Sequence, residues 1–232
     1  MSTRITGISS MATRQVLAEL AAAYERRSGQ QVAIESAGGV AAARRVEEGE
    51  LFDIVVLAAD AIDRLAAAGR VDPGSRVDFA RSGVALAVPA GAPHPDIGTE
   101  AAVRNAVLAA PSIGYSTGPS GTYLTRLFER WGIAATIAPR IVQAPPGVPV
   151  GTLIARGEVH LGFQQSSELM HLSGIDMIGV LPPEIQVTTI FSAAICTLCT
   201  ASAQCEAARA LLNFLASPDA DSAKRAHGME PA

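Results

Sequence analysis

The chain has 232 residues, of which 49% are hydrophobic and 17% are charged. This length and composition suit a globular protein, either one large domain or two small lobes around a buried core. The net charge is −4, and only 4% of the residues are aromatic. We therefore expect neither a nucleic acid nor an anionic membrane as a partner.

The cysteines and histidines indicate no metal site. Three cysteines, an odd number, do not suggest a disulfide scaffold. Cys196 and Cys199 have C-x-x-C spacing, but they lie in an apolar run, where residues three apart in a strand face opposite sides. The four histidines are scattered without ligand spacing. We predict core packing for this cysteine pair, and neither a metal nor a cofactor.

The first residues show no signal for export. Residues 1–6 contain no apolar segment of the kind found in a signal peptide. The sequence therefore favours a cytoplasmic protein without membrane insertion. If a leader was removed, the expected compartment is the periplasm, and a transporter or sensor is the expected partner.

Strand-turn-helix units fill the first part of the chain. Apolar spacing predicts strands at 5–8, 32–36 and 52–57 and helices at 13–27, 40–48 and 61–68. Such units form parallel sheets, and their ligands bind beyond the carboxyl ends of the strands. The turns that follow the first two strands, with Ser9, Ser10 and residues 37–39, are expected on the same rim.

A strand at 84–88 leads into a second alternation of helices and strands. Helices are expected at 100–108, 122–131, 150–156, 204–215 and 219–226, and strands at 112–115, 137–143, 161–164, 175–180 and 187–199. We expect the last two helices to return to the first lobe. The predicted domains are residues 1–82 with 190–232 and residues 83–189, with a ligand cleft between them.

Residues 114–123 (GYSTGPSGTY) are the most informative stretch. They indicate a strand end, a glycine-rich turn and the start of a helix. Hydroxyl groups and the first N–H groups of a helix favour a small anion, so the turn is a candidate anion site. The alternative, with about equal support, is an ordinary helix cap.

Four segments carry a resemblance to a known family. They are 5–6 (IT), 52–60 (FDIVVLAAD), 119–123 (PSGTY) and 157–163 (GEVHLGF). In this order and spacing, the chain resembles the type 2 periplasmic-binding-protein fold, and within it the molybdate-binding protein family, over essentially its full length. The resemblance implies an α/β fold of two lobes, each a mostly parallel sheet flanked by helices.

The family binds a small oxyanion through hydroxyl and N–H groups of four turns. The matching positions are Ser9 to Ala12, Ala37 to Gly39, Ser120, and Gly147 to Val148. Ala12 stands where the family has a ligand serine, a glycine at 38 or 39 replaces a second serine, and Gln165 replaces a tyrosine. A tetrahedral oxyanion would lack donors here, and an unsatisfied buried charge is costly.

These replacements favour a larger organic acid. Glycines open space, and amides both donate and accept hydrogen bonds. We therefore predict a protein that binds a small di- or tricarboxylate through hydroxyl and helix N-terminal N–H groups. Some relatives with this fold isomerise aconitate, which requires a 1,3-proton shift. The alternatives are such an isomerase and a molybdate or tungstate receptor of an ABC transporter.

The resemblance and the turn pattern together define the candidate site. The predicted ligand-binding residues are Ser9, Ser10, Met11, Ala37, Gly38, Gly39, Ser116, Ser120, Gly121, Thr122, Gly147, Val148, Gln164 and Gln165. Candidates for proton transfer are Glu35, Tyr115 and Glu168. The structural alternative is a solvated or salt-bridged carboxylate for the two glutamates, and interlobe hydrogen bonding for Tyr115.

Overall fold

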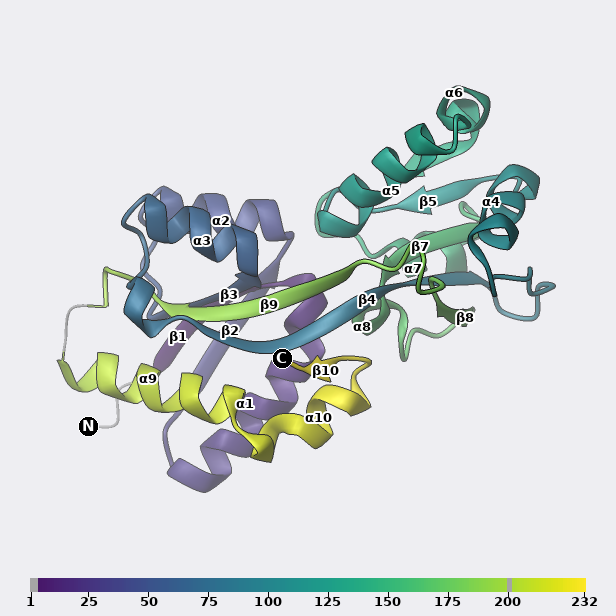
Figure 1. Ribbon diagram of the computed structural model, residues 1–232. Helices are drawn as coiled ribbons and strands as arrows, with labels where there is room; N and C mark the ends of the chain where they lie inside the picture. The colour runs from purple at the N-terminus through teal and green to yellow at the C-terminus, as the bar shows by residue number, and fades with distance from the viewer. Residues whose placement is uncertain (1–3, 200–201) are drawn as a thin grey trace. The chain divides into compact units, whose positions relative to one another are not determined.

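The computed structural model describes residues 4–199 and 202–232 (Figure 1). The chain divides into two compact units. Unit 1 comprises Met1–Ser82 and Ile190–Ala232, and unit 2 comprises Gly83–Thr189. Each unit has its own sheet and its own apolar clusters. None of the helices in the described part of the chain is long and apolar enough to span a membrane.

Unit 1 contains a mixed sheet with the strand order β2-β1-β3-β9-β4, and β10 pairs with β4. The strands are β1 (Ile5–Ser10), β2 (Val32–Ala37), β3 (Ile54–Ala58), β4 (Val77–Pro89), β9 (Thr188–Ile195) and β10 (Glu230–Pro231). β1 pairs in parallel with β2 and β3, whereas β9 is antiparallel to β3. The sequence prediction of a mostly parallel sheet is therefore corrected to a mixed one.

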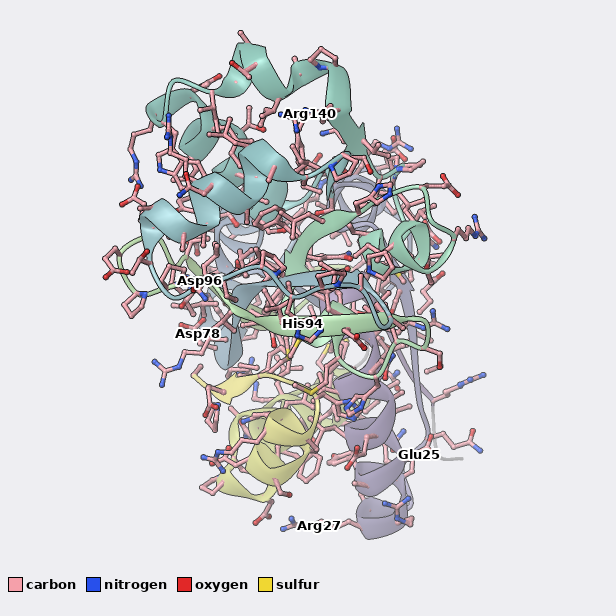
Figure 2. All side chains as sticks on the ribbon, turned by 90° about the vertical axis from the view of Figure 1, so that its right-hand side faces the viewer. Glu25, Arg27, Asp78, His94, Asp96 and Arg140 are labelled. Carbon is pink, nitrogen blue, oxygen red and sulfur yellow. The ribbon has the colours of Figure 1, made fainter. Side chains whose placement is uncertain are left out.

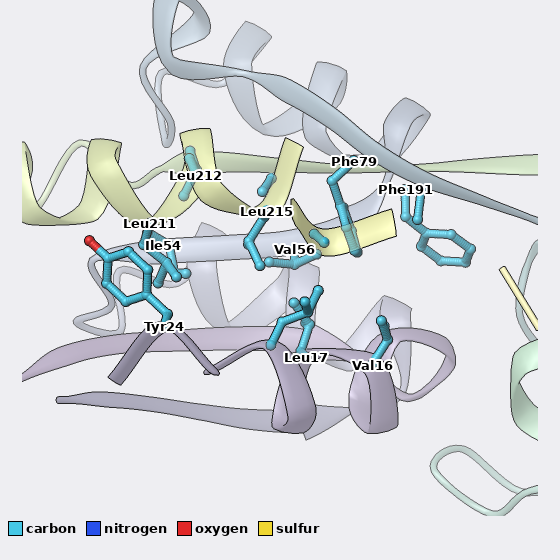
Figure 3. Packing of buried hydrophobic residues seen from close by; sticks show 14 of the residues in the cluster. Val16, Leu17, Tyr24, Ile54, Val56, Phe79, Phe191, Leu211, Leu212 and Leu215 are labelled. Carbon is cyan, nitrogen blue, oxygen red and sulfur yellow. The ribbon is translucent and has the colours of Figure 1, made fainter. Parts of the chain in front are cut away.

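Helices cover both faces of the sheet in unit 1. They are α1 (Arg14–Ser28), α2 (Gly39–Glu47), α3 (Ala59–Ala67), α9 (Ser202–Ala216) and α10 (Asp221–Ala226). α1, α9 and α10 lie on one face, and α2 and α3 on the other (Figure 1). Figure 3 shows how Leu17 of α1 and Leu215 of α9 approach Val56 of β3, where burial of apolar surface stabilises the unit.

The C-terminal end of α1 carries charged side chains on the surface, among them Glu25 and Arg27 (Figure 2). α1 ends at Gly29, whose φ of 72° is a left-handed conformation that glycine adopts easily. The carboxylate of Glu25 accepts a hydrogen bond of 2.7 Å from the N–H of Val32 and so fixes the entry into β2. Arg27 pairs with Asp219 in solvent, where an ion pair contributes little to stability.

Unit 2 contains a second mixed sheet. Its strands are the second half of β4, β5 (Ile113–Tyr115), β6 (Ile141–Gln143), β7 (Leu161–Gln165) and β8 (Ile175–Val180). β5 pairs in parallel with β6 and β7, and β4 is antiparallel to β7 and β8.

Helices also cover both faces of this second sheet. They are α4 (Glu100–Ala109), α5 (Pro119–Arg130), α6 (Ala134–Ile137), α7 (Val150–Ala155) and α8 (Ser166–Leu169). α4 and α5 pack in one apolar cluster, and α7 and α8 pack in another.

Some boundaries differ from those that the sequence predicts. The segment predicted as strand 137–143 forms α6, a 3-10 turn at Ala138–Arg140, and only then β6. Pro139 lies in the first turn of that 3-10 helix, where its missing N–H costs nothing. α5 begins at Pro119 rather than at Thr122, and proline is likewise well tolerated in this first turn.

Candidate ligand site

The predicted site residues of unit 2 follow three strands that end at one edge of the sheet. Tyr115 at the end of β5 pairs with Gln143 of β6 and with Phe163 of β7. Because these strands are parallel and in register, the segments that follow them leave the sheet at the same edge. Those segments are the glycine-rich turn, the loop 144–149 and the polar run Gln164 to Glu168.

The glycine-rich turn brings two serine hydroxyls together. The Oγ atoms of Ser116 and Ser120 are 3.5 Å apart, and Ser116 Oγ accepts a hydrogen bond from the N–H of Gly118 at 3.3 Å. Ser120 is buried, with 2% of its surface exposed. α5 starts here without a side-chain cap on its N-terminal N–H groups. The first turn of α5 therefore keeps N–H donors that an anion can use.

Gly121 and Thr122 lie in the same first turn, in different surroundings. A Cβ atom at Gly121 would lie 1.7 Å from the carbonyl oxygen of Ser116, so no larger residue fits without moving the turn. Thr122 is exposed, and its hydroxyl donates to the carbonyl oxygen of Gly118 at 3.4 Å. Gly121 is thus required for the shape of the turn, whereas the Thr122 hydroxyl is already used locally.

Loop 144–149 places its predicted residues less favourably. Gly147 is exposed and has a φ of 80°, which favours glycine. The N–H of Val148 donates to the carbonyl oxygen of Pro145 at 3.0 Å, and its side chain packs against the cluster beneath α7. The Val148 N–H therefore closes a turn in this structure.

The polar run after β7 contains a buried carboxyl group. Gln164 Nε2 donates to Glu168 Oε1 at 2.6 Å, and Gln164 Oε1 accepts from the N–H of Val150 at 2.7 Å. The residue Glu168 is partly exposed, but protein surrounds its carboxyl group, and this burial raises its pKa to about 7. The hydrogen bond from Gln164 has the smaller, opposite effect. Glu168 is thus a carboxyl group that can both accept and donate a proton near neutral pH.

Two other buried polar atoms of residues 164–168 lack partners among the described residues. They are Gln165 Oε1 and the hydroxyl oxygen of Ser167. Gln165 Nε2 donates to the hydroxyl of Thr189 at 2.8 Å, and both Gln165 and Ser167 are at most 5% exposed. An unpaired buried polar atom is costly unless water or a ligand pairs with it. The Ser167 hydroxyl is therefore free to donate to a polar ligand group, and Gln165 Oε1 is free to accept from one.

The predicted residues of unit 1 also collect at one sheet edge. Ser9 of β1 is in register with Ser36 of β2, and their hydroxyl oxygens are 2.8 Å apart. The hydroxyl of Ser10 is 3.4 Å from that of Thr13. Ser9 is fully buried and Ser10 is 8% exposed. The Ser9 hydroxyl is occupied within the protein, and Ser10 lies nearer to solvent.

The turn after β2 supplies backbone donors rather than side chains. α2 begins at Gly39, with Gly38 as its N-cap, and glycine provides no capping oxygen for the first N–H groups. A Cβ atom at Gly39 would lie 3.8 Å from Cβ of Ser10, so the two turns are neighbours. Ala37 and Met11 are partly exposed beside them. This edge of unit 1 thus combines N–H donors with the hydroxyl of Ser10.

Two candidates for proton transfer have other roles in the structure. The carboxylate of Glu35 forms two hydrogen bonds of 3.0 Å with the guanidinium of Arg45, which also pairs with Glu50. This ion pair is one of the structural alternatives expected for Glu35. The ring of Tyr115 packs on Phe128, with 6.2 Å between the ring centroids. Of the three candidates, Glu168 alone combines a buried carboxyl group with a pKa near neutrality.

Several polar residues at these edges were not among the predicted ligand residues. Ser36 and Thr13 contact Ser9 and Ser10, and Ser167 lies within the polar run after β7. The run Gln-Gln-Ser-Ser-Glu at 164–168 was a usable signal for Ser167, since a polar run across the end of a strand is typical of a site. The contact of Thr13 depends on the 3-10 turn after β1, which the sequence pattern does not reveal.

In the described part of the chain, neither a metal-binding cluster nor a groove adds to these sites. Among the described residues, no group of three or more His, Cys, Asp or Glu side chains could hold a metal ion. A groove of about 950 Å³ in unit 1 lies along α1 and β2 and reaches Phe52. Its lining contains none of the predicted ligand-binding residues, so it does not coincide with the turns described above.

The fold and the polar turns at the sheet edges are those of the solute-binding-protein class. The chain belongs to the family described as bacterial extracellular solute-binding protein, whose model matches residues 5–230. It is also 39% identical to aconitate isomerase from Pseudomonas sp. in an alignment of 235 positions, gaps included. This alignment covers 99% of this chain and 88% of that protein. This relationship confirms the family resemblance that the sequence segments indicate.

Solved structures share the fold at lower sequence identity. The periplasmic molybdate-binding protein of Azotobacter vinelandii is 19% identical, with a TM-score of 0.79 over 97% of this chain and 98% of that chain. The structure of L-phospholactate-bound PEB3 is 12% identical, with a TM-score of 0.75 over 97% and 99% of the two chains. At these identities the similarity establishes the α/β periplasmic-binding-protein fold alone.

Proposed function

We propose that this protein is an isomerase that moves the double bond of a small unsaturated tricarboxylate such as aconitate. The observation that carries the proposal is the 39% identity to aconitate isomerase over 99% of this chain. The sequence predicts ligand binding as the main function and an isomerase as an alternative. We now prefer the isomerase.

The proposed reaction is a 1,3-proton shift. A base removes a proton from the carbon next to a carboxylate, the double bond moves by one position, and a proton returns at the other end of the three-carbon unit. Substrate and product have the same composition, so neither an oxidant nor a second substrate is needed. The reaction does require a group that is ionised in the first step and protonated in the second.

We assign this group to Glu168. Its pKa of about 7 means that both the ionised and the protonated form are populated at neutral pH. A general base is most effective when its pKa lies near the working pH. The hydrogen bond from Gln164 fixes the carboxyl group and links it to the N–H of Val150.

Removal of the proton places negative charge on the adjacent substrate carboxylate, which needs hydrogen-bond donors. We assign this role to Ser116, Ser120 and the first N–H groups of α5. α5 has 12 residues, so its N-terminus also contributes a favourable dipole. The Ser167 hydroxyl, which has no partner among the described residues, is proposed to donate a hydrogen bond to a second carboxylate.

The donors of unit 1 are proposed to bind carboxylate as well, through Ser10 and the first N–H groups of α2. That they act on the same ligand as the donors of unit 2, as the expected cleft requires, stays a prediction of the sequence. The substitution Ser10→Ala tests it, because this change should raise the KM for aconitate if both units contact the substrate.

Incubation with pure cis-aconitate or pure trans-aconitate, followed by proton NMR, tests the proposed function. We expect each acid to convert into the same mixture of the two. If both acids raise the melting temperature but neither is converted, the protein is a carboxylate binder and the proposal is wrong. If only molybdate or tungstate raises the melting temperature, the protein is an oxyanion receptor, and the proposal is wrong as well.

A further inference from the structure

Cys199 and Cys205 lie side by side in unit 1, although the sequence motif pairs Cys199 with Cys196. The sulfur atoms of Cys199 and Cys205 are 2.6 Å apart, and Cys205 Sγ lies 2.7 Å from the carbonyl oxygen of Cys199. Cys196 is 3% exposed and packs in the cluster beneath α3. The structure thus separates one core cysteine from a pair of partly exposed, neighbouring thiols.

This thiol pair lies between the end of one element and the start of another. Cys199 follows β9, and Cys205 lies in the first turn of α9, a helix that packs in the core with Leu211, Leu212 and Leu215. β9 is antiparallel to β3, with Ile195 opposite Ile54 at the beginning of β3. The pair therefore lies at the sheet edge opposite the one where β1 and β3 end, away from Ser10.

We propose that Cys199 and Cys205 form a reversible intramolecular disulfide that fastens the start of α9 to the end of β9. The sulfur atoms are already close, and a disulfide of about 2.05 Å requires only a small further approach. Closing this short loop restricts the unfolded chain, which is how a disulfide stabilises a fold in the chain-entropy account.

The oxidant in this proposal is a low-molecular-weight disulfide. The Cys205 thiolate attacks one sulfur of the reagent, and one reagent thiol leaves. The Cys199 thiolate then attacks Cys205 Sγ in the mixed disulfide, and the second reagent thiol leaves. The protein loses two electrons and two protons, and the two reagent thiols carry them.

The second step depends on ionisation of Cys199. Burial, followed by the neighbouring Cys205, raises the pKa of the Cys199 thiol to about 12. Since only the thiolate attacks, ring closure should be slow at neutral pH and become faster as the pH rises. The Asp53 carboxylate also raises the pKa of Cys199. Asp53 lies close to the cysteine pair, since the side chain of Gln204, the residue before Cys205, donates from Nε2 to Asp53 Oδ2 at 2.7 Å.

Treatment of the full chain with oxidised glutathione, followed by thiol counting under denaturing conditions, tests the proposal. We expect the three thiols of the chain to fall to one. The intact mass should decrease by two hydrogen atoms, and the melting temperature should rise by roughly 5 to 10 °C. A dithiol reductant should restore the starting values.

Matched variants locate the bond. Cys196→Ser should lose both remaining thiols on oxidation, whereas Cys199→Ser should retain glutathione on Cys205, Cys205→Ser should react only slowly with the reagent, and neither should gain stability. Three remaining thiols, a wild-type chain that keeps glutathione without ring closure, or an unchanged melting temperature after closure would each overturn the proposal.

Discussion

At Glu168, burial and one hydrogen bond act on the same carboxyl group in opposite directions. Burial raises the pKa and the hydrogen bond from Gln164 lowers it, and burial has the larger effect. The folded protein therefore holds a proton on Glu168 at a pH where the unfolded chain has released it. This difference links protein stability to pH as well as catalysis.

Replacement of Glu168 by Gln should remove part of that pH dependence. The folded pKa of about 7 lies above the ordinary value of 4.5 for glutamate, so wild-type stability should fall as the pH rises from 4.5 to 7. The contribution is about 3 kcal/mol over this window. Urea unfolding of wild type and Glu168→Gln at pH 5 and pH 7.5 measures it. An equal pH dependence in both proteins would contradict the burial of this carboxyl.

The sequence predicted Glu168 as a candidate but not as the preferred one. Glu35, Tyr115 and Glu168 all lie at or just after strand ends, and a strand end alone does not separate an ion pair from a buried carboxyl. The separation comes from partners distant in the chain, such as Arg45 for Glu35. The residue types could therefore be predicted, whereas their electrostatic surroundings could not.

Between elements, Gln164 connects β7 to the first residue of α7 and to Glu168. The substitution Gln164→Leu removes the hydrogen bond that lowers the pKa of Glu168, so this pKa should rise further. The acid limb of the pH profile of kcat/KM for aconitate should then move to higher pH.

Gln165→Leu is the matched control for this substitution. Gln165 is also buried at the end of β7, but its amide bonds to Thr189 instead of Glu168. We expect Gln165→Leu to leave the acid limb in place. An unmoved acid limb in Gln164→Leu would show that Gln164 does not set the pKa of the catalytic group.

The turn before α5 depends on Gly121. In Gly121→Ala, the new Cβ would overlap the carbonyl oxygen of Ser116, and the turn must move. We expect a loss of about 1–3 kcal/mol in stability, as for other overpacked sites, together with a higher KM. Gly118→Ala is the control, since its Cβ would be 3.5 Å from Ser116 Oγ, an ordinary contact. Equal stability of both variants in urea would contradict the close approach.

At the level of elements, strong apolar periodicity was sufficient for most of the fold. β8 has the predicted bounds, 175–180, α1 is shifted by one residue at each end, and α4 is one residue longer than predicted. The predicted strand was wrong for residues 137–140, because an apolar residue such as Ile137 can be buried by a helix as well as by a strand. β4 begins at Val77, seven residues before the predicted start. Its first half, with Phe79 and Ala80 both buried and Arg81 exposed, lacks the regular alternation that predicts a strand.

For the whole molecule, the order of elements was more informative than any single motif. The family resemblance read from four segments is confirmed by the match over residues 5–230. The expected mostly parallel sheets are mixed, because β4 and β9 run antiparallel to their neighbours β7 and β3. The cytoplasmic location and the ligand cleft stay predictions.

Ligand binding should stabilise the whole molecule, by a free energy that grows with the logarithm of the ligand concentration above the Kd. At a hundred times the Kd, aconitate should add about 2.7 kcal/mol to the free energy of unfolding. For a chain of this size, the melting temperature should rise by about 5 to 10 °C. Differential scanning fluorimetry with aconitate, citrate, molybdate and sulfate measures this. A shift with molybdate and none with aconitate would contradict the organic-acid site.

The central claim is that Glu168 moves the proton, and one comparison tests it most directly. Wild type, Glu168→Gln and the surface control Glu184→Gln are incubated with saturating cis-aconitate at pH 7.5, and formation of trans-aconitate is followed by proton NMR. The account predicts that Glu184→Gln matches wild type and that Glu168→Gln is slower by roughly 100-fold to 10,000-fold, the range for loss of a general base. A folded Glu168→Gln protein that isomerises aconitate at the wild-type rate would contradict it.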